Sequence, residues 1–153
     1  MQIRKAIKSD VPAIVAMLAD DELGQKREDY RDPLPYMYSE AFDKINGDPN
    51  QYLIVAEDNE EIIGTAQLTF IPYLTYQGGV RAQIEAVRIK STRRGTGLGE
   101  KLFRWMIVDK ARNEGAHLLQ LTTDKQRPDA LRFYEKLGFQ ATHEGMKMHF
   151  EVN

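Results

Sequence analysis

Three glycines lie two residues apart in one short stretch, and two arginines precede them: Arg93, Arg94, Gly95, Gly97 and Gly99. Backbone without Cβ atoms lets an anion come close. A helix that begins here would also present unpaired N–H groups and the positive end of its dipole. The arginines add positive charge to the same place. We therefore expect a strand-to-helix turn that binds a pyrophosphate group.

The glycine spacing separates the known kinds of phosphate-binding turn. A P-loop requires a Lys followed by Ser or Thr after its last glycine, whereas Gly99 is followed by Glu-Lys-Leu, so the P-loop is excluded. A dinucleotide fingerprint requires Gly-x-Gly-x-x-Gly, which this turn misses by one residue. Asp124 stands near where a ribose-binding acid would be, so a nucleotide oxidoreductase stays as a weaker alternative. A tight connection that binds no ligand also stays open.

Three segments together resemble the GNAT superfamily of N-acetyltransferases. The stretch from Arg94 to Gly99 resembles the family's Arg/Gln-x-x-Gly-x-Gly/Ala turn, and residues 83–89 resemble its preceding strand. Residues 130–139, which end in Phe-Tyr-Glu-Lys-Leu-Gly-Phe, resemble its late helix. The resemblance covers essentially the whole chain in the right order. It implies an enzyme that moves an acetyl group from acetyl-CoA directly to a primary amine of a small molecule or a protein side chain.

The resemblance also implies how the acyl donor is held. The strand before the turn would splay from its parallel partner, so that the backbone of Val87 and Ile89 pairs with the pantetheine arm. The pyrophosphate would lie on the backbone of the turn, formed by Arg94, Gly95, Thr96, Gly97, Leu98 and Gly99. The family often has an Asn where this sequence has Arg127, and we expect Arg127 to reach a phosphate instead.

Two residues match the family's positions for proton transfer. The amine must lose a proton and the departing thiolate must gain one. Tyr134 matches the family's tyrosine acid, and a phenol is a plausible donor to a thiolate. Glu85 stands on the splayed strand, where the family often has an acid that draws the proton from the amine. Tyr134 also fits a purely structural core stripe, and Glu85 also fits an ordinary exposed strand position. With no Cys, and no Ser beside an evident base, we expect no covalent enzyme intermediate.

The acceptor is not identified by the sequence. Aromatic side chains can stack on a cationic amine and an arginine can bind a carboxylate. On that basis the candidate substrate-binding residues are Tyr30, Arg31, Tyr36 and Tyr73. Each also fits a core or rim position. The three histidines do not have metal-ligand spacing, so we expect no metal.

The elements around the turn follow from hydrophobic periodicity and turn residues. Strands are expected near residue 3 and over 52–56, 62–75 with a break at Pro72, 82–89, 117–123, 139–142 and 146–152. Helices are expected from residue 11 to near 24, and over 36–45, 98–115 and 128–137. The fold class is α/β: a GNAT-like, central, mixed and splayed sheet of about six or seven strands, flanked by about four helices.

Composition excludes several classes of protein. The 153 residues carry a formal charge of −2 with no cysteine, which argues against a broad nucleic-acid surface and excludes a disulfide framework. No apolar run approaches the roughly 18 residues of a membrane span. We expect a single domain over residues 1–153, with a cytoplasmic location as the default. Exposed strand edges near the C-terminus make a homodimer possible. A non-catalytic, acyl-CoA-binding regulatory module is the alternative function.

Overall fold

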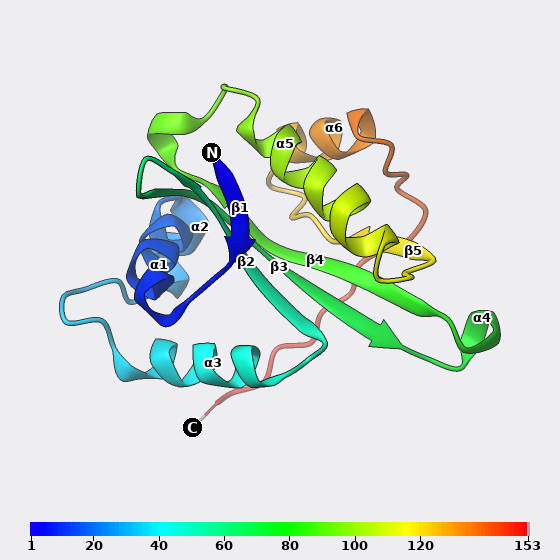
Figure 1. Ribbon diagram of the computed structural model, residues 1–153, viewed down its shortest axis with the longest axis horizontal. Coiled ribbons are helices and arrows are strands. Elements are labelled where there is room, and N and C mark those ends of the chain that lie inside the picture. Colours follow the sequence, from blue (N-terminus) through cyan, green and yellow to red (C-terminus); the bar gives the residue numbers. More distant parts are fainter. Residues whose placement is uncertain (153) are drawn as a thin grey trace.

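A five-stranded sheet is the centre of the computed structural model, which describes residues 1–152, and helices cover both its faces (Figure 1). The strands are β1 (Gln2–Lys5), β2 (Gln51–Asp58), β3 (Glu61–Pro72), β4 (Val80–Ile89) and β5 (Leu118–Leu121). They lie side by side in chain order. Neighbours from β1 to β4 are antiparallel, whereas β4 and β5 are parallel.

The helices connect these strands across the two faces. The α-helices are α1 (Val11–Ala19), α2 (Glu22–Arg27), α3 (Tyr36–Gly47), α4 (Thr75–Gly78), α5 (Leu98–Arg104) and α6 (Pro128–Lys136). Two 3₁₀ turns, η1 (Lys8–Asp10) and η2 (Ser91–Arg93), and a π-helical segment, η3 (Trp105–Arg112), complete the set. Helix α5 continues directly into η3, and the pair forms the crossover between the parallel strands β4 and β5.

The alternation of side chains along β2 divides the core into two layers. Successive strand residues point to opposite faces, so Ile54 and Val55 lie on different sides of the sheet. Ile54 packs in a cluster with Phe103 of α5, and Val55 packs in a second cluster with Ile14 of α1 and Phe42 of α3. Figure 1 shows the corresponding arrangement, with α1 and α3 on one face and α5 and α6 on the other.

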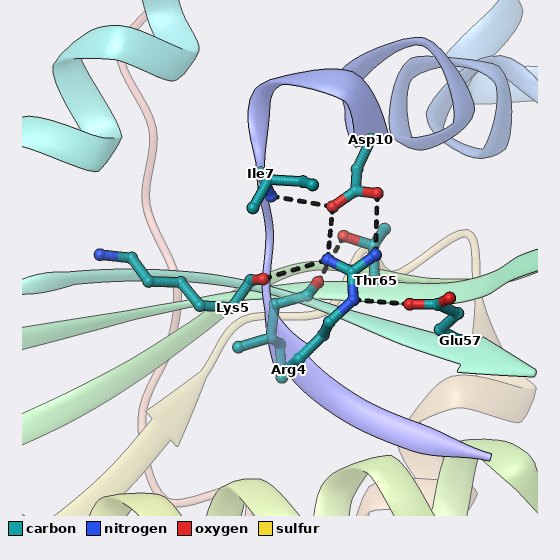
Figure 2. A network of polar contacts seen from close by, with 7 residues as sticks. Arg4, Lys5, Ile7, Asp10, Glu57 and Thr65 are labelled. Atoms are coloured by element: carbon teal, nitrogen blue, oxygen red, sulfur yellow. Dashed lines mark hydrogen bonds and ion pairs between the residues drawn. The ribbon is translucent and has the colours of Figure 1, made fainter. Parts of the chain in front are cut away.

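A polar network fixes the start of the chain against the sheet (Figure 2). The guanidinium of Arg4 donates two hydrogen bonds to Asp10, at 2.7 and 3.0 Å, and one to Glu57 at 2.6 Å. The backbone N–H of Ile7 donates to the same Asp10 carboxylate at 2.8 Å. Burial favours the neutral form of Asp10, but these hydrogen bonds outweigh it and lower its pKa. The network joins β1, β2 and the residue that precedes α1.

The first helical region differs from the sequence prediction. Instead of one helix running to Gly24, α1 ends at Ala19 and a separate six-residue helix, α2, begins at Glu22. The cause is Asp21, whose carboxylate accepts a hydrogen bond from the N–H of Gly24 at 2.6 Å and so caps a new helix.

The strand count is lower than predicted, because the strands expected at 139–142 and 146–152 do not form. The apolar residues of the second segment are instead exposed: Met146, Met148, Phe150 and Val152. Alternating apolar residues favour a strand only where the segment packs against a neighbouring strand, and this segment does not pair with β5. Residues 139–152 make local backbone bonds, such as Thr142 N–H to Gln140 at 3.0 Å, and β5 remains the edge of the sheet.

The six α-helices exceed the four or so expected, because α1 and α2 are separate and the short α4 forms where the strand over 62–75 was expected to end. The sheet itself agrees more closely with the sequence analysis. The sheet is mixed, helices cover both faces, and β3 ends at Pro72 as the break there predicted. Helices α3 and α6 lie within two residues of their expected bounds. Within residues 1–152, none of the helices combines the length and the apolar character that crossing a bilayer requires.

Candidate active site

The glycine turn lies between η2 and the first residue of α5, as the sequence predicted. Gly95 and Gly97 have φ angles of +75° and +80°, in the left-handed region that side chains disfavour. Gly97 occupies the N-cap position of α5 without a capping side chain, so the first N–H groups of the helix face outward without a side-chain partner. The hydroxyl of Thr96 donates to the carbonyl of Arg93 at 2.6 Å and closes the turn. The local geometry is that of an anion-binding helix start.

A pocket of about 340 Å³ opens on this turn. It is lined by Ile89, Arg93, Arg94, Gly95, Gly97, Leu98, Gly99, Glu100, Phe133 and Lys136. The structure therefore brings six of the predicted cofactor residues together around one space. Phe133 and Lys136 come from α6 and were missed by the sequence analysis, although both stand in the segment that carried the family resemblance. A Cβ atom added at Gly95 or Gly97 would meet no protein atom within 4 Å, so a ligand has room against this backbone.

The cations of the turn are partly neutralised by neighbouring acids. Arg93 lies 3.6 Å from Asp58 and 3.5 Å from Glu61, and Lys90 pairs with the same glutamate. Arg94 reaches the α1–α2 loop, where it donates to the carbonyl of Asp20 at 3.3 Å. The turn is thereby fastened to the β2–β3 hairpin on one side and to the α1–α2 loop on the other.

Strand β4 continues beyond the end of its parallel neighbour before it reaches the turn. Its pairing with β5 ends at Ile84 and Leu121, five residues before β4 itself ends. A bulge follows, in which Ala86 has a φ of +54°, a strained value for a residue with a side chain. Glu85 stands at this bulge with an exposed side chain. Glu85 is the first β4 residue beyond the pairing with β5, and the splay expected from the family resemblance stays a prediction.

Two backbone carbonyls beyond the bulge accept hydrogen bonds from arginine side chains. The carbonyl of Val87 accepts from Nη1 of Arg88 at 2.8 Å, and that of Ile89 accepts from Nε of Arg94 at 3.3 Å. Both carbonyls belong to the residues predicted to pair with the pantetheine arm. Side-chain donors thus satisfy backbone groups that a sheet neighbour would otherwise satisfy.

Tyr134 lies on α6 among aromatic rings of the core. Its ring centroid is 5.4 Å from that of Phe103, 5.6 Å from Phe133 and 6.1 Å from Phe139. Burial raises the pKa of its phenol, and the charges of Arg127 and Arg88 reduce that rise without reversing it. The hydroxyl is therefore protonated at neutral pH. Tyr134 therefore packs in the core, as a structural residue would, and also keeps the proton that a general acid needs.

A charged cluster lies in the same neighbourhood as Tyr134. Asp21 accepts a hydrogen bond from Nη2 of Arg127 at 2.7 Å and lies 3.3 Å from Nε of Arg88. Burial opposes ionisation of Asp21, but the Gly24 N–H and the two arginines outweigh it and lower its pKa. Arg127 is thus directed to the α1–α2 loop and is absent from the lining of the turn pocket. The sequence analysis missed Asp21. The available signal was its position three residues before Gly24.

The four predicted substrate residues do not gather at one place. Tyr30 and Tyr36 are exposed in and after the α2–α3 loop, where Arg31 pairs with Asp29 at 3.2 Å. Tyr73 follows β3 and hydrogen-bonds with His117. Figure 1 shows the α2–α3 loop and helix α4 at opposite ends of the long axis. The N–H of Tyr73 donates to the carbonyl of Gly79, directly after α4, so Tyr73 lies with α4 and away from the other three. In the described part of the chain, the His, Asp and Glu side chains form no group of three or more suited to a metal ion.

Comparison with known proteins gives consistent matches. The model of the acetyltransferase (GNAT) family matches residues 15–139. An aminoalkylphosphonate N-acetyltransferase of Salmonella typhimurium strain LT2 is 28% identical over 93% of this chain and 86% of its own length. A glucosamine 6-phosphate N-acetyltransferase of Trypanosoma brucei brucei is 33% identical over 57% of this chain and 56% of its own.

A solved structure is similar over nearly the full chain. It is described as a transcriptional regulator from Bacillus halodurans C-125. It shares 59% of its sequence, has a TM-score of 0.94, and the match covers 97% of this chain and 99% of that one.

Proposed function

This chain belongs to the GNAT family of acetyltransferases, and we propose that residues 1–153 form a single acyltransferase domain that moves an acetyl group from acetyl-CoA to a primary amine. The observation that carries the proposal is the meeting of three features on α6 and β4. The turn pocket includes Phe133 and Lys136 of α6, the adjacent Tyr134 carries a protonated phenol, and β4 has no parallel partner from Glu85 onward.

The turn fits the pyrophosphate of the donor. Gly95 and Gly97 leave open space above the backbone, and Gly97 leaves the start of α5 uncapped. Under this proposal the backbone from Arg94 to Gly99 binds the pyrophosphate, and Lys136 adds a cation. Val87 and Ile89 supply backbone partners to the pantetheine arm. Arg127 stays a predicted phosphate ligand, although its bond to Asp21 favours a different role, argued below.

The bound donor supplies a thioester carbonyl that a free amine can attack. Glu85 accepts a proton from the incoming amine, directly or through water, because its side chain is exposed at the point where β4 loses its parallel partner. Tyr134 donates a proton to the departing sulfur, and its raised pKa keeps that proton available at neutral pH. The proton taken at one end of the reaction is thereby balanced by the proton given at the other.

A small-molecule acceptor is favoured over a protein side chain. The two curated relatives are named for small amines, an aminoalkylphosphonate and glucosamine 6-phosphate. The exposed Tyr30, Arg31 and Tyr36 remain candidates for the acceptor side, and Tyr73 is a weaker one because it lies at the far end of the β3–β4 hairpin.

Replacement of the proposed acid tests the mechanism. Tyr134→Phe keeps the ring in the aromatic core and removes only the hydroxyl, so we expect turnover to fall by about 10²-fold or more, with acetyl-CoA affinity nearly unchanged. Acetyl-CoA consumption and calorimetric titration measure the two quantities. Tyr52→Phe is the matched control, because Tyr52 lies against Lys110 and outside the turn pocket. An unchanged rate in Tyr134→Phe would remove this residue from the mechanism.

A regulatory module that binds acyl-CoA without turnover is the second candidate. It is favoured by the description of the 59% identical structure as a transcriptional regulator. Purified protein that binds acetyl-CoA tightly but consumes none of it across a broad amine panel would favour this candidate. Consumption with any amine at a rate that Tyr134→Phe depresses would reject it.

A further inference from the structure

Two arginines from separate elements contact one carboxylate near Tyr134, and a third arginine, Arg27, lies close enough to act on the charge of Arg88. Arg27 ends α2, Arg88 stands on β4 beyond the bulge, and Arg127 precedes the first residue of α6. The carboxylate is that of Asp21, which lies within 3.3 Å of Arg88 and 2.7 Å of Arg127. Three guanidinium cations and one carboxylate leave a formal charge of +2 in a region that adjoins the proposed proton donor.

The cluster keeps hydrogen-bond donors that its own carboxylate does not use. The Nε of Arg88 is buried and has no hydrogen-bond partner, because its 3.3 Å approach to Asp21 lacks hydrogen-bond geometry. Arg127 bonds to Asp21 through Nη2. Arg27 forms no ion pair within 4.0 Å in residues 1–152. A buried, unsatisfied guanidinium N–H is unusual and costly in a folded protein.

Mutual repulsion within the cluster is also visible at Arg88. Burial lowers the pKa of this guanidinium, Asp21 opposes the change, and the charges of Arg127 and Arg27 act with burial. One carboxylate therefore compensates the three cations incompletely. A second anion would relieve the remaining repulsion and satisfy the unused donors.

We propose that Arg88 and Arg127, with Arg27 as a further positive charge in their neighbourhood, form a cluster that binds an anionic group, a phosphate, phosphonate or carboxylate, carried by the amine acceptor. This inference rests on the proposed acetyl transfer. Asp21 demonstrates that an oxyanion fits between Arg88 and Arg127. The pyrophosphate of the donor is not the ligand, because the three arginines are absent from the lining of the turn pocket. The anion instead positions the amine beside Tyr134.

The test compares three primary amines of matched length: 2-aminoethylphosphonate, 3-aminopropanoate and propylamine. We expect kcat/KM for at least one anionic amine to exceed that for propylamine by about tenfold or more, since charge-assisted hydrogen bonds to guanidinium groups are strong. The ratio between the first two amines distinguishes a phosphorus oxyanion from a carboxylate. Equal kcat/KM values for all three amines would overturn the inference while leaving acetyl transfer intact.

Variants assign the preference to the cluster. Arg27→Gln should raise KM for the anionic amine severalfold, with little change in the propylamine rate or in acetyl-CoA affinity. Arg88→Gln also removes the hydrogen bond to the Val87 carbonyl, so it is judged by a ratio: kcat/KM for the anionic amine divided by kcat/KM for propylamine should fall by about tenfold. Arg27 is exposed, so its variant leaves the core intact. Arg81→Gln is the control: Arg81 is also on β4 and also has a buried, unpartnered Nε, but it lies over the ring of Tyr73. A preference that survives both cluster variants would overturn the assignment.

A binding measurement separates this inference from the proposed function. If none of the amines is acetylated, acetyl transfer fails, and the cluster is then judged by calorimetric titration with inorganic phosphate in the presence of CoA, which fills the turn pocket. Phosphate binding that Arg88→Gln abolishes and Arg81→Gln preserves would support the anion site. Absence of phosphate binding, together with absence of an anionic preference, would overturn it.

Discussion

At the scale of single residues, the ionised state of a few carboxylates is the property most open to test. Asp10 is 6% exposed, yet Arg4 and the Ile7 N–H keep its pKa below the ordinary value despite burial. A carboxyl whose pKa is lowered by folding stabilises the protein above its unfolded-state pKa of about 3.9. That stabilisation is lost as pH falls through the lower, folded-state pKa.

Asp10→Asn should therefore destabilise the protein in a pH-dependent way. The variant removes the charge partner of Arg4, and we expect the free energy of unfolding at neutral pH to fall by roughly 2 kcal/mol. The difference from the native protein should shrink as pH falls from about 4 through the lower, folded-state pKa of Asp10, below which the carboxyl is protonated in both states. Urea unfolding at several pH values measures it. Asp43→Asn is the control, because its pair with Lys8 is more than half exposed and should change stability by under about 0.5 kcal/mol.

At this scale the sequence was informative where a residue acts through its own backbone. The glycines at 95 and 97 were recognised from spacing alone, because left-handed φ angles and an uncapped helix start are local properties. Asp21 was missed because its role comes from Arg88 and Arg127, which lie far away along the chain. Long-range ion pairs have no signature in the spacing of residues.

At the scale of elements, the start of α5 needs a glycine at position 97 for two reasons: its left-handed backbone conformation and the space that a ligand would occupy above it. Gly97→Ala should lower the free energy of unfolding by about 1–2 kcal/mol, since its φ is +80°. It should also weaken acetyl-CoA binding by more than about tenfold, because the new methyl group enters the space above the turn. Thermal unfolding and calorimetric titration report the two effects separately.

Gly115→Ala is a closely matched control for that experiment. Gly115 also has a φ of +80°, and a Cβ there would likewise meet no protein atom within 4 Å. It follows η3, however, and is absent from the lining of the turn pocket. We expect the same loss of stability without loss of acetyl-CoA affinity. Equal losses of affinity in both variants would show that the turn backbone does not hold the donor.

Elements were predicted best where their own periodicity determined them. Helix α6 has a consistent apolar face and was expected within one residue of its observed end. The bulge in β4 was not predicted, because Ala86 takes a φ of +54° that its residue type disfavours. Tertiary packing of β3 against β4 imposes that angle through the register shift between Thr65 and Gln67.

At the scale of the whole molecule, the contrast between core and C-terminal segment predicts where stability resides. Phe103 is 1% exposed and contacts the rings of Phe133 and Tyr134, whereas Phe150 is 78% exposed. Phe103→Ala should cost about 3–5 kcal/mol of unfolding free energy, and Phe150→Ala should cost under about 0.5 kcal/mol. Chemical denaturation measures both. A large loss in Phe150→Ala would indicate that this residue is buried in solution.

The C-terminal segment also shows where the sequence prediction failed at the scale of the whole molecule. The alternation of apolar residues over 146–152 predicted a terminal strand, but pairing requires an edge that the local pattern cannot supply. The homodimer expected from exposed strand edges stays a prediction, and sedimentation of the purified protein is its direct measurement.

The α1–α2 loop gives two regions of the molecule a common mechanical support. Asp20 holds Arg94 of the glycine turn, and the next residue, Asp21, holds Arg88 and Arg127. A displacement of Arg94 therefore acts on Asp20, and the neighbouring residue Asp21 contacts Arg88 and Arg127 of the cluster. Any cooperativity transmitted through these two residues must be reciprocal: a factor by which the first ligand changes affinity for the second is the factor by which the second changes affinity for the first.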